Sequence, residues 1–300
     1  MLIKNLLNKN NISDNYTTTL ITVDYDNSFI TYYMLKSFLR LKDSGSIIIC
    51  VLINKENQYI YLLEELTKTY KNINLIYNYH SRLLKNCDEH DNIEFGWGSY
   101  NHSLSLQYLI DNYVFTKNVL ICDSDIIFKD IFDIAYFIDE LNTYDIISVI
   151  TDFKGQTSYI VEKLFKAESY RYIINNLNIY TYMIDNKFLT IYGRFDPFCI
   201  FFKTQLLKEN TIIDDKSDID ILCMSSPNYM IDSQKTNFIC CDTFGKLTYK
   251  LLSKNYKIKS STLELYNAVT HFSGASSWKF ITDKKSYYND FVKQYCNLES

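Results

Sequence analysis

Two aspartates separated by a single residue, Asp123 and Asp125, are the strongest candidates for chemistry in this chain. They follow a short apolar run with β-branched residues, Val119–Cys122, which is typical of a buried strand. Apolar residues return at Ile126–Phe128, so we expect both carboxylates to be semi-buried at the carboxyl end of a core strand. In open α/β sheets, ligands bind in the crevice outside those strand ends. Hard oxygen ligands on a rigid element suit Mg²⁺ or Mn²⁺, which a phosphate-bearing ligand would share.

The same Asp-x-Asp pattern occurs twice more, so the pattern alone proves little. Asp218–Asp220 lies in a polar stretch that is typical of a solvated loop. Asp24 and Asp26 follow an apolar strand and compete for the same crevice. A strand-terminal turn with a helix-capping aspartate would also explain Asp123 and Asp125. The apolar sequence on both sides of the latter pair favours it as the site.

The chain before this pair alternates between strand and helix patterns. The expected elements are a strand at Thr17–Val23, a helix at Ser28–Lys42 with Ser28 as its N-cap, a strand at Ser46–Ile53, a helix at Tyr59–Tyr70, a strand at Ile73–Tyr77 and a helix at Asn101–Asn112. This alternation predicts a parallel, doubly wound sheet with right-handed crossovers.

A long polar segment, Asn78–Ser99, separates the third strand from the helix that leads to the aspartate pair. It ends at Gly98 and Ser99, which we expect near the same crevice. A helix N-terminus at that point can help to hold an anionic group. His102, close to the expected helix start, is interpreted as a capping or packing residue, with contact to a donor sugar as the alternative.

The second half of the chain is less regular. Its expected elements are a helix at Ile131–Leu141, strands at Asp145–Thr151, Phe198–Phe202 and Phe238–Cys241, a helix at Asp242–Asn255, an edge strand at Tyr256–Lys259, a strand-like segment at Ala268–Phe272 and a helix at Asp283–Cys296. The Tyr- and Asn-rich segment Asp152–Asn186 has two interpretations: a helical insert near an acceptor site, or a flexible lid.

Composition excludes several classes of function. With 300 residues, 47% of them hydrophobic, the chain can bury one large core. Its net charge is -4, with no basic stripe, so we expect no nucleic-acid partner. It contains neither G-x-G-x-x-G after the first strand nor G-x-x-x-x-G-K-[ST], which disfavours a dinucleotide dehydrogenase and a P-loop nucleotidase. The eight cysteines include no C-x-x-C, and no signal-peptide or membrane-spanning run is present. We expect a cytoplasmic protein, with peripheral contact to the inner face of a membrane left open.

From Thr17 to Trp278 the chain resembles the GT-A nucleotide-sugar glycosyltransferases, most closely the glycosyltransferase family 2-like group. Four segments carry the resemblance: VLICDSDIIF for the strand and D-x-D, GSYNHSLSLQYLI for the preceding loop and helix, ICCDTFGKLTYKLLSKNYKI for the catalytic segment, and VTHFSGASSW for a late histidine strand. Two positions depart from the family pattern, because Cys241 stands in place of Glu and Asn255 in place of Gly. HFSGASSW also resembles the H-x-x-G-x-x-K-P-W of family 8 retaining enzymes, although it is one residue short and lacks Lys-Pro.

The resemblance implies a GT-A fold: an α/β, Rossmann-like, doubly wound and mostly parallel sheet flanked by helices. It implies a single domain over residues 1–300. Residues 15–150 would bind the nucleotide sugar, residues 151–280 would bind the acceptor and carry catalysis, and residues 281–300 would form a C-terminal helix.

The resemblance also implies roles for the acidic residues. Asp125 is expected to be the main metal ligand, Asp123 a ligand through water or a ribose contact, and His271 the third ligand. Asp242 is expected to be the general base of an inverting reaction, although an N-cap role would explain an aspartate there as well.

The donor is expected to touch further residues. Asp24 and Asp26 would lie by the nucleotide base, and Gly98 and Ser99 by the phosphates. Arg194 would pair with a phosphate or a sugar carboxylate.

The expected activity is transfer of a sugar from a UDP- or GDP-sugar to a glycan or lipid-linked acceptor, with Mn²⁺ or Mg²⁺ as cofactor. The open alternatives are a retaining family 8-like enzyme on the same fold, a sugar nucleotidyltransferase and a non-catalytic carbohydrate-binding protein. A nucleotidyltransferase normally has a Gly- and Lys/Arg-rich loop after its first strand, which Val23–Asn27 lacks.

Overall fold

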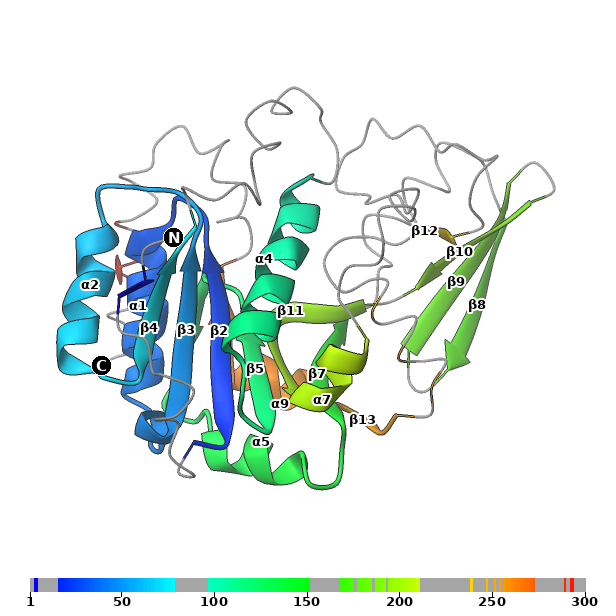
Figure 1. Ribbon diagram of the computed structural model, residues 1–300. Coiled ribbons are helices and arrows are strands. Elements are labelled where there is room, and N and C mark those ends of the chain that lie inside the picture. Colours follow the sequence, from blue (N-terminus) through cyan, green and yellow to red (C-terminus); the bar gives the residue numbers. More distant parts are fainter. Residues whose placement is uncertain are drawn as a thin grey trace.

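A mixed sheet of eight strands forms the centre of the computed structural model (Figure 1). The structure describes residues 3–4, 16–78, 97–151, 168–174, 177–184, 187–192, 194–210, 238–239 and 256–272, and single positions 247, 251, 254, 289, 292 and 293. In order across the sheet, the strands are β1 (Ile3–Lys4), β4 (Ile73–Tyr77), β3 (Ile47–Ile53), β2 (Thr18–Asp24), β5 (Asn118–Cys122), β11 (Arg194–Lys203), β7 (Ile146–Thr151) and β13 (Ile258–Ser260).

Most strands of this sheet run in the same direction. β4, β3, β2 and β5 are parallel neighbours, and β13 is parallel to β7. β11 is antiparallel to both β5 and β7, and β1 is antiparallel to β4 at the edge. The predicted doubly wound, mostly parallel sheet is therefore confirmed, as is the prediction that the segment at Tyr256–Lys259 forms an edge strand.

The central strands form because both of their faces are covered. Every residue of β2, β3, β4 and β5 is buried, which matches their continuous β-branched and apolar sequences. Successive residues alternate between two hydrophobic clusters: Ile49 and Val51 belong to one, Ile48 and Cys50 to the other. The sheet thus has a core on each face.

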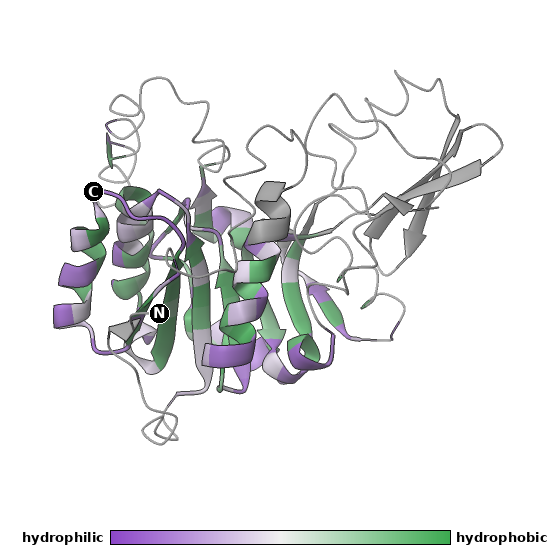
Figure 2. Ribbon diagram, turned by 45° about the horizontal axis from the view of Figure 1, so that its top comes forward, coloured by the Kyte–Doolittle hydropathy of each residue, from purple (hydrophilic) through white to green (hydrophobic). Residues whose placement is uncertain are grey.

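Helices cover the two faces of the sheet (Figure 1). The first cluster contains side chains of α1 (Ser28–Leu39), α2 (Ile60–Thr69), α5 (Ile134–Glu140) and α9 (Thr262–Ala268), and the second contains side chains of α4 (Trp97–Tyr113) and α7 (Thr204–Glu209). Figure 2 shows hydrophobic residues concentrated on the strands and hydrophilic residues on the outer face of α2. None of the helices within the described residues is long and apolar enough to cross a bilayer.

The start of α1 differs from the expectation. Asn27, and not Ser28, is the N-cap residue, and it makes no side-chain capping hydrogen bond. Ser28 lies inside the helix, where its hydroxyl accepts a hydrogen bond of 2.9 Å from the Asn57 amide. The turn is held instead by Asp24, whose Oδ1 accepts a hydrogen bond of 3.1 Å from the Asn27 N–H.

A second sheet corrects the prediction for the Tyr- and Asn-rich segment. β8 (Glu168–Ile174), β9 (Leu177–Ile184) and β10 (Lys187–Tyr192) form an antiparallel meander, which β12 (Phe238–Ile239) extends in parallel. The helical interpretation is therefore wrong where the structure describes this segment. In the sequence, Asn175-Asn176 and Asp185-Asn186 separate runs rich in tyrosine and isoleucine, and asparagine and aspartate commonly bound strand-forming runs.

A small third sheet joins two distant segments. β6 (Ile126–Phe128) directly follows the aspartate pair and pairs antiparallel with β14 (Val269–His271). Residues 262–268 form α9, which the sequence analysis did not predict because two helical turns carry little periodic signal. The predicted helices at residues 242–255 and 283–296 lie almost entirely outside the described residues.

The first prediction concerns the core. Phe201 is fully buried and stacks on Phe137, with ring centroids 5.1 Å apart. Replacing it with alanine should lower the free energy of unfolding by about 3–5 kcal/mol, since a large cavity would remain. Urea unfolding measures this. The control Tyr61→Ala, on the exposed face of α2, should change it by less than about 0.5 kcal/mol. Equal effects of the two substitutions would contradict the described packing.

Candidate metal centre

Asp123 and Asp125 lie at the carboxyl end of β5, as the sequence predicted. β5 ends at Cys122, and the Asp123 N–H donates a hydrogen bond of 3.2 Å to the carbonyl of Phe198 on the neighbouring strand β11. The chain turns at residues 124 and 125 and continues as β6. The two carboxylates are thus fixed between two backbone segments, with Asp125 only 6% exposed.

β14 brings His271 to this pair. In the register of the two strands, His271 lies opposite Ile126, the residue after Asp125. The N–H of Phe272 donates a hydrogen bond of 2.9 Å to the backbone carbonyl of Asp125. The imidazole therefore reaches the carboxylates through backbone pairing, and its place does not depend on a flexible loop.

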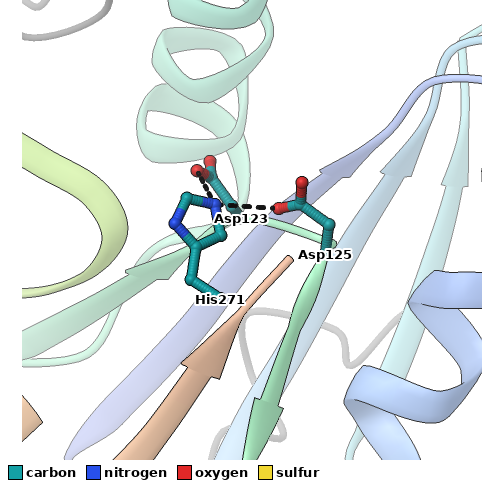
Figure 3. A group of neighbouring side chains, drawn as sticks. All are labelled: Asp123, Asp125 and His271. Carbon is teal, nitrogen blue, oxygen red and sulfur yellow. Dashed lines mark ion pairs between the residues drawn. The ribbon is translucent and has the colours of Figure 1, made fainter. Parts of the chain in front are cut away.

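The three side chains converge on one point (Figure 3). His271 Nε2 lies 3.4 Å from Asp125 Oδ1 and 3.9 Å from Asp123 Oδ2. Each residue offers one ligand atom, and these atoms all lie within 4.8 Å of one another. Two carboxylate oxygens and one imidazole nitrogen at this spacing fit a divalent cation.

The electrostatics of the group also favour a cation. Burial acts to lower the pKa of His271, but the hydrogen bond and charge of Asp125, with the charges of Asp123 and Asp196, outweigh it and raise that pKa to about 9. The negative charges that stabilise a proton on the His271 imidazole would also stabilise a divalent cation bound between His271, Asp123 and Asp125.

His102 is closer to the centre than its expected position suggested. α4 begins at Trp97, so His102 lies within the helix and not at its start. Its Nε2 is 3.8 Å from Asp123 Oδ1. Gly98, with its poor helix propensity, explains why the sequence analysis began this helix too late.

Asp24 ends β2 and Asp26 lies in the bend that follows it, at the same edge of the sheet but in a different environment. Asp24 is fully buried, and burial raises its pKa to about 6, although the Asn27 N–H and the nearby hydroxyls of Ser28 and Thr31 act against that rise. Asp26 has a positive φ of 58° and forms an ion pair of 3.2 Å with Lys55. Neither residue belongs to the metal-ligand group.

The remaining predicted residues are only partly placed. Gly98 and Ser99 lie in the first turn of α4, and Arg194 is the first residue of β11, but the structure describes only the backbone at these positions. Asp242 lies outside the described residues altogether.

The surroundings of the triad include residues that the sequence analysis did not single out. Phe198 stacks on the His271 ring, with centroids 5.4 Å apart and an interplanar angle of 13°. Asp196 accepts a hydrogen bond of 3.3 Å from the Phe198 N–H and adds its charge to the site. In the sequence, Asp196 and Phe198 are marked only by the pattern Asp196-Pro197-Phe198 at the start of an apolar strand. That pattern does not indicate that this strand lies beside the strand that ends just before Asp123.

No protein-family model and no curated protein matches this chain. Solved structures do match. A mannosyltransferase of Pyrobaculum calidifontis, in complex with GDP-Man and Mn²⁺, is 12% identical and aligns over 81% of this chain and 54% of its own, with a TM-score of 0.46. The glycosyltransferase GlyE of Streptococcus pneumoniae is 11% identical over 92% and 60% of the two chains, with a TM-score of 0.44.

A 4-diphosphocytidyl-2C-methyl-D-erythritol synthase of Anaerococcus prevotii also matches, at 11% identity over 82% and 86% of the two chains and a TM-score of 0.39. This chain spans little more than half the length of the mannosyltransferase chain. At such low identities and scores, the residues of the site itself must support any assignment of function.

The second prediction concerns Asp24. A folded-state pKa near 6, above the usual value of 3.8, means that the charged carboxylate destabilises the folded protein above pH 6 and that this penalty fades as the pH falls towards 4. Asp24→Asn keeps an acceptor for the Asn27 N–H. It should therefore be more stable than the unmodified protein by about 1–3 kcal/mol at pH 7.5 and equally stable near pH 4. Urea unfolding across this range tests it, and a constant difference at all pH values would refute it.

Proposed function

We propose that this protein is a metal-dependent glycosyltransferase that moves a sugar from a nucleoside-diphosphate donor to the hydroxyl of a glycan or lipid-linked acceptor. The observation that carries the proposal is the Asp123–Asp125–His271 group at the carboxyl edge of a doubly wound sheet. Such an edge is where α/β sheets bind ligands, and the group has the ligand chemistry of a divalent cation that a diphosphate can share.

Asp125 and His271 would hold the cation directly, with Asp123 as the third ligand or as a contact to the ribose. When bound, a divalent cation such as Mn²⁺ or Mg²⁺ neutralises the charge that develops on a departing diphosphate. His102, 3.8 Å from Asp123, is placed to orient that carboxylate or to donate to a phosphate oxygen. The low exposure of Asp125 supports a site from which water is excluded, as glycosyl transfer to an acceptor requires.

The donor would extend from this group along the edge of the sheet. The backbone N–H groups at Gly98 and Ser99, at the start of α4, suit the phosphates, and Arg194 supplies a positive charge. Asp26, two residues beyond the end of β2 and with its side chain 22% exposed, can accept a hydrogen bond from a nucleotide base. Asp24 is fully buried, so its part would be to hold the turn that presents Asp26.

We propose that the reaction inverts the sugar and that Asp242 is the general base that takes the proton of the acceptor hydroxyl. A retaining reaction on the same fold is the alternative. The three cysteines in the described part of the chain, Cys50, Cys122 and Cys199, are free and buried, which agrees with a reducing, cytoplasmic location.

The third prediction tests the metal centre. Asp125→Asn and His271→Ala should each weaken Mn²⁺ binding by at least about a hundredfold, because each removes a ligand and the remaining charges cannot compensate. Isothermal titration with Mn²⁺, with and without UDP or GDP, measures this. Asp130→Asn is the matched control, since Asp130 is exposed and pairs with Arg40 at 3.8 Å outside the group. Tight Mn²⁺ binding by both triad variants would remove the basis of the proposed function.

The fourth prediction tests the catalytic assignment. Asp242→Asn should lower kcat by about 10²–10⁴-fold and leave Mn²⁺ and nucleotide binding unchanged, as expected for loss of a general base. NMR of the product anomer gives the stereochemistry, and Asp220→Asn in the polar stretch is the control. Nearly full turnover in Asp242→Asn, or a retained anomer, would favour the retaining alternative, and release of pyrophosphate from a nucleoside triphosphate would indicate a nucleotidyltransferase.

A further inference from the structure

Three nearly parallel rings connect the metal centre to the protein surface. Phe198 is fully buried, and it stacks on His271 as described above and on Tyr266 of α9. The Tyr266 and Phe198 centroids lie 5.4 Å apart, with an interplanar angle of 15°. Tyr266 is 46% exposed, so it is the solvent-facing member of the three. An aromatic ring is thereby held at the surface, one side chain away from a proposed metal ligand.

Packing of α9 does not account for this tyrosine. The helix is anchored by Leu265 and Ala268, which are 0% and 5% exposed. A single exposed aromatic residue is common on protein surfaces and by itself indicates nothing. Tyr266 differs because stacking on Phe198 fixes its ring plane, and because a carboxylate lies beside it.

That carboxylate is Asp196. Its Oδ1 accepts a hydrogen bond of 3.3 Å from the N–H of Phe198, which places it next to the stacked rings. Burial raises the pKa of the Tyr266 hydroxyl, and the charge of Asp196 raises it further, so the carboxylate lies close to that hydroxyl. An aromatic face and an acidic acceptor are therefore fixed together at the edge of the metal centre.

This combination matches the two kinds of surface that a pyranose presents. One face of a sugar ring is made of C–H groups, which pack on an aromatic ring, and its rim carries hydroxyls, which donate hydrogen bonds to a carboxylate. A lipid chain would need an extended aliphatic surface and would leave the carboxylate desolvated and unused. The nearby charge therefore favours a saccharide as the ligand.

The origin of the two residues indicates which substrate they would contact. Asp196 on β11 lies on the side of β5 opposite to β2, whose end is proposed for the donor base, and Tyr266 of α9 lies with it; Arg194 is the one proposed donor contact on this side. We propose that Tyr266 and Asp196 form a subsite for the acceptor, in which a pyranose stacks on Tyr266 and donates a hydroxyl hydrogen bond to Asp196. This inference rests on the proposed function. It means that the part of the acceptor that enters the site is a sugar.

Saturation-transfer NMR with the full chain tests the subsite. The probes are methyl glycosides of glucose, galactose, mannose and N-acetylglucosamine, each measured with and without Mn²⁺ and UDP or GDP. We expect at least one glycoside to bind the unmodified protein. Tyr266→Ala should weaken that binding by about tenfold, whereas Tyr266→Phe, which keeps the ring, should retain it. Asp196→Asn should weaken it less than Tyr266→Ala does.

Matched measurements separate a lost subsite from a damaged fold. The affinity of Tyr266→Ala for nucleotide and Mn²⁺ should stay within about twofold of the unmodified protein, because Tyr266 is not a proposed ligand of either. If Tyr266→Ala does not fold, Tyr266→Leu keeps apolar contact with Phe198 without the aromatic face and should show the same loss. Tyr61→Ala, an equal truncation on the remote helix α2, should not affect glycoside binding.

The outcomes that overturn the inference differ from those that overturn the proposed function. The subsite is refuted if the protein binds nucleotide and Mn²⁺ but no glycoside, or if Tyr266→Ala binds glycosides normally. It is also refuted if Tyr266→Ala instead loses binding to phosphatidylglycerol vesicles, which would indicate a lipid surface. Glycoside binding that depends on Tyr266 in a protein without nucleotide or Mn²⁺ affinity would keep the subsite and refute the transferase.

Discussion

Mutual repulsion of two neighbouring carboxylates, one of them almost fully buried, is the constraint around which this protein is built. Asp123 and Asp125 leave a buried strand one residue apart, and Asp125 is 6% exposed. Such charges need compensation, because burial of an unpaired carboxylate is strongly unfavourable. The imidazole of His271 supplies it in the described structure, and the same three groups are suited to a metal ion. The parallel strands, α4 and the β6–β14 pair all serve to hold these side chains together.

The aromatic residues around the centre serve the same purpose in a different way. The Phe198 ring covers one side of the His271 imidazole. Its backbone carbonyl accepts a hydrogen bond from the Asp123 N–H, and its own N–H donates to the Asp196 carboxylate. A low local dielectric strengthens each of these electrostatic interactions. In the eight-stranded sheet as described, β11 runs antiparallel to both its neighbours, and this reversal brings Phe198 and Cys199, in the middle of β11, alongside the end of β5. The polarity of a single strand thus decides which side chains surround the metal centre.

Much of the fold was predictable, because its strongest signals are local. β3 and β4 match their expected ranges almost to the residue, since continuous β-branched runs between polar residues leave little ambiguity. The Asp pair was predictable for the same reason. β8, β9 and β10 were not, because tyrosine and asparagine suit several structures and the strands are defined by pairing with one another. His271 was identified through resemblance, but the contributions of Asp196 and Tyr266 depend on strand order and on a helix of two turns, which local sequence does not determine.

The pairing of β6 with β14 also has a consequence for how the protein acquires its site. It joins residues 126–128 to residues 269–271, so its formation requires the closure of a very long loop and adds a high-contact-order step to folding. During synthesis the two aspartates leave the ribosome well before the histidine does, and the central strands can assemble first. The nascent chain therefore carries an incomplete, acidic half-site until its last segments dock, and premature termination before residue 269 would yield a sheet without a finished centre.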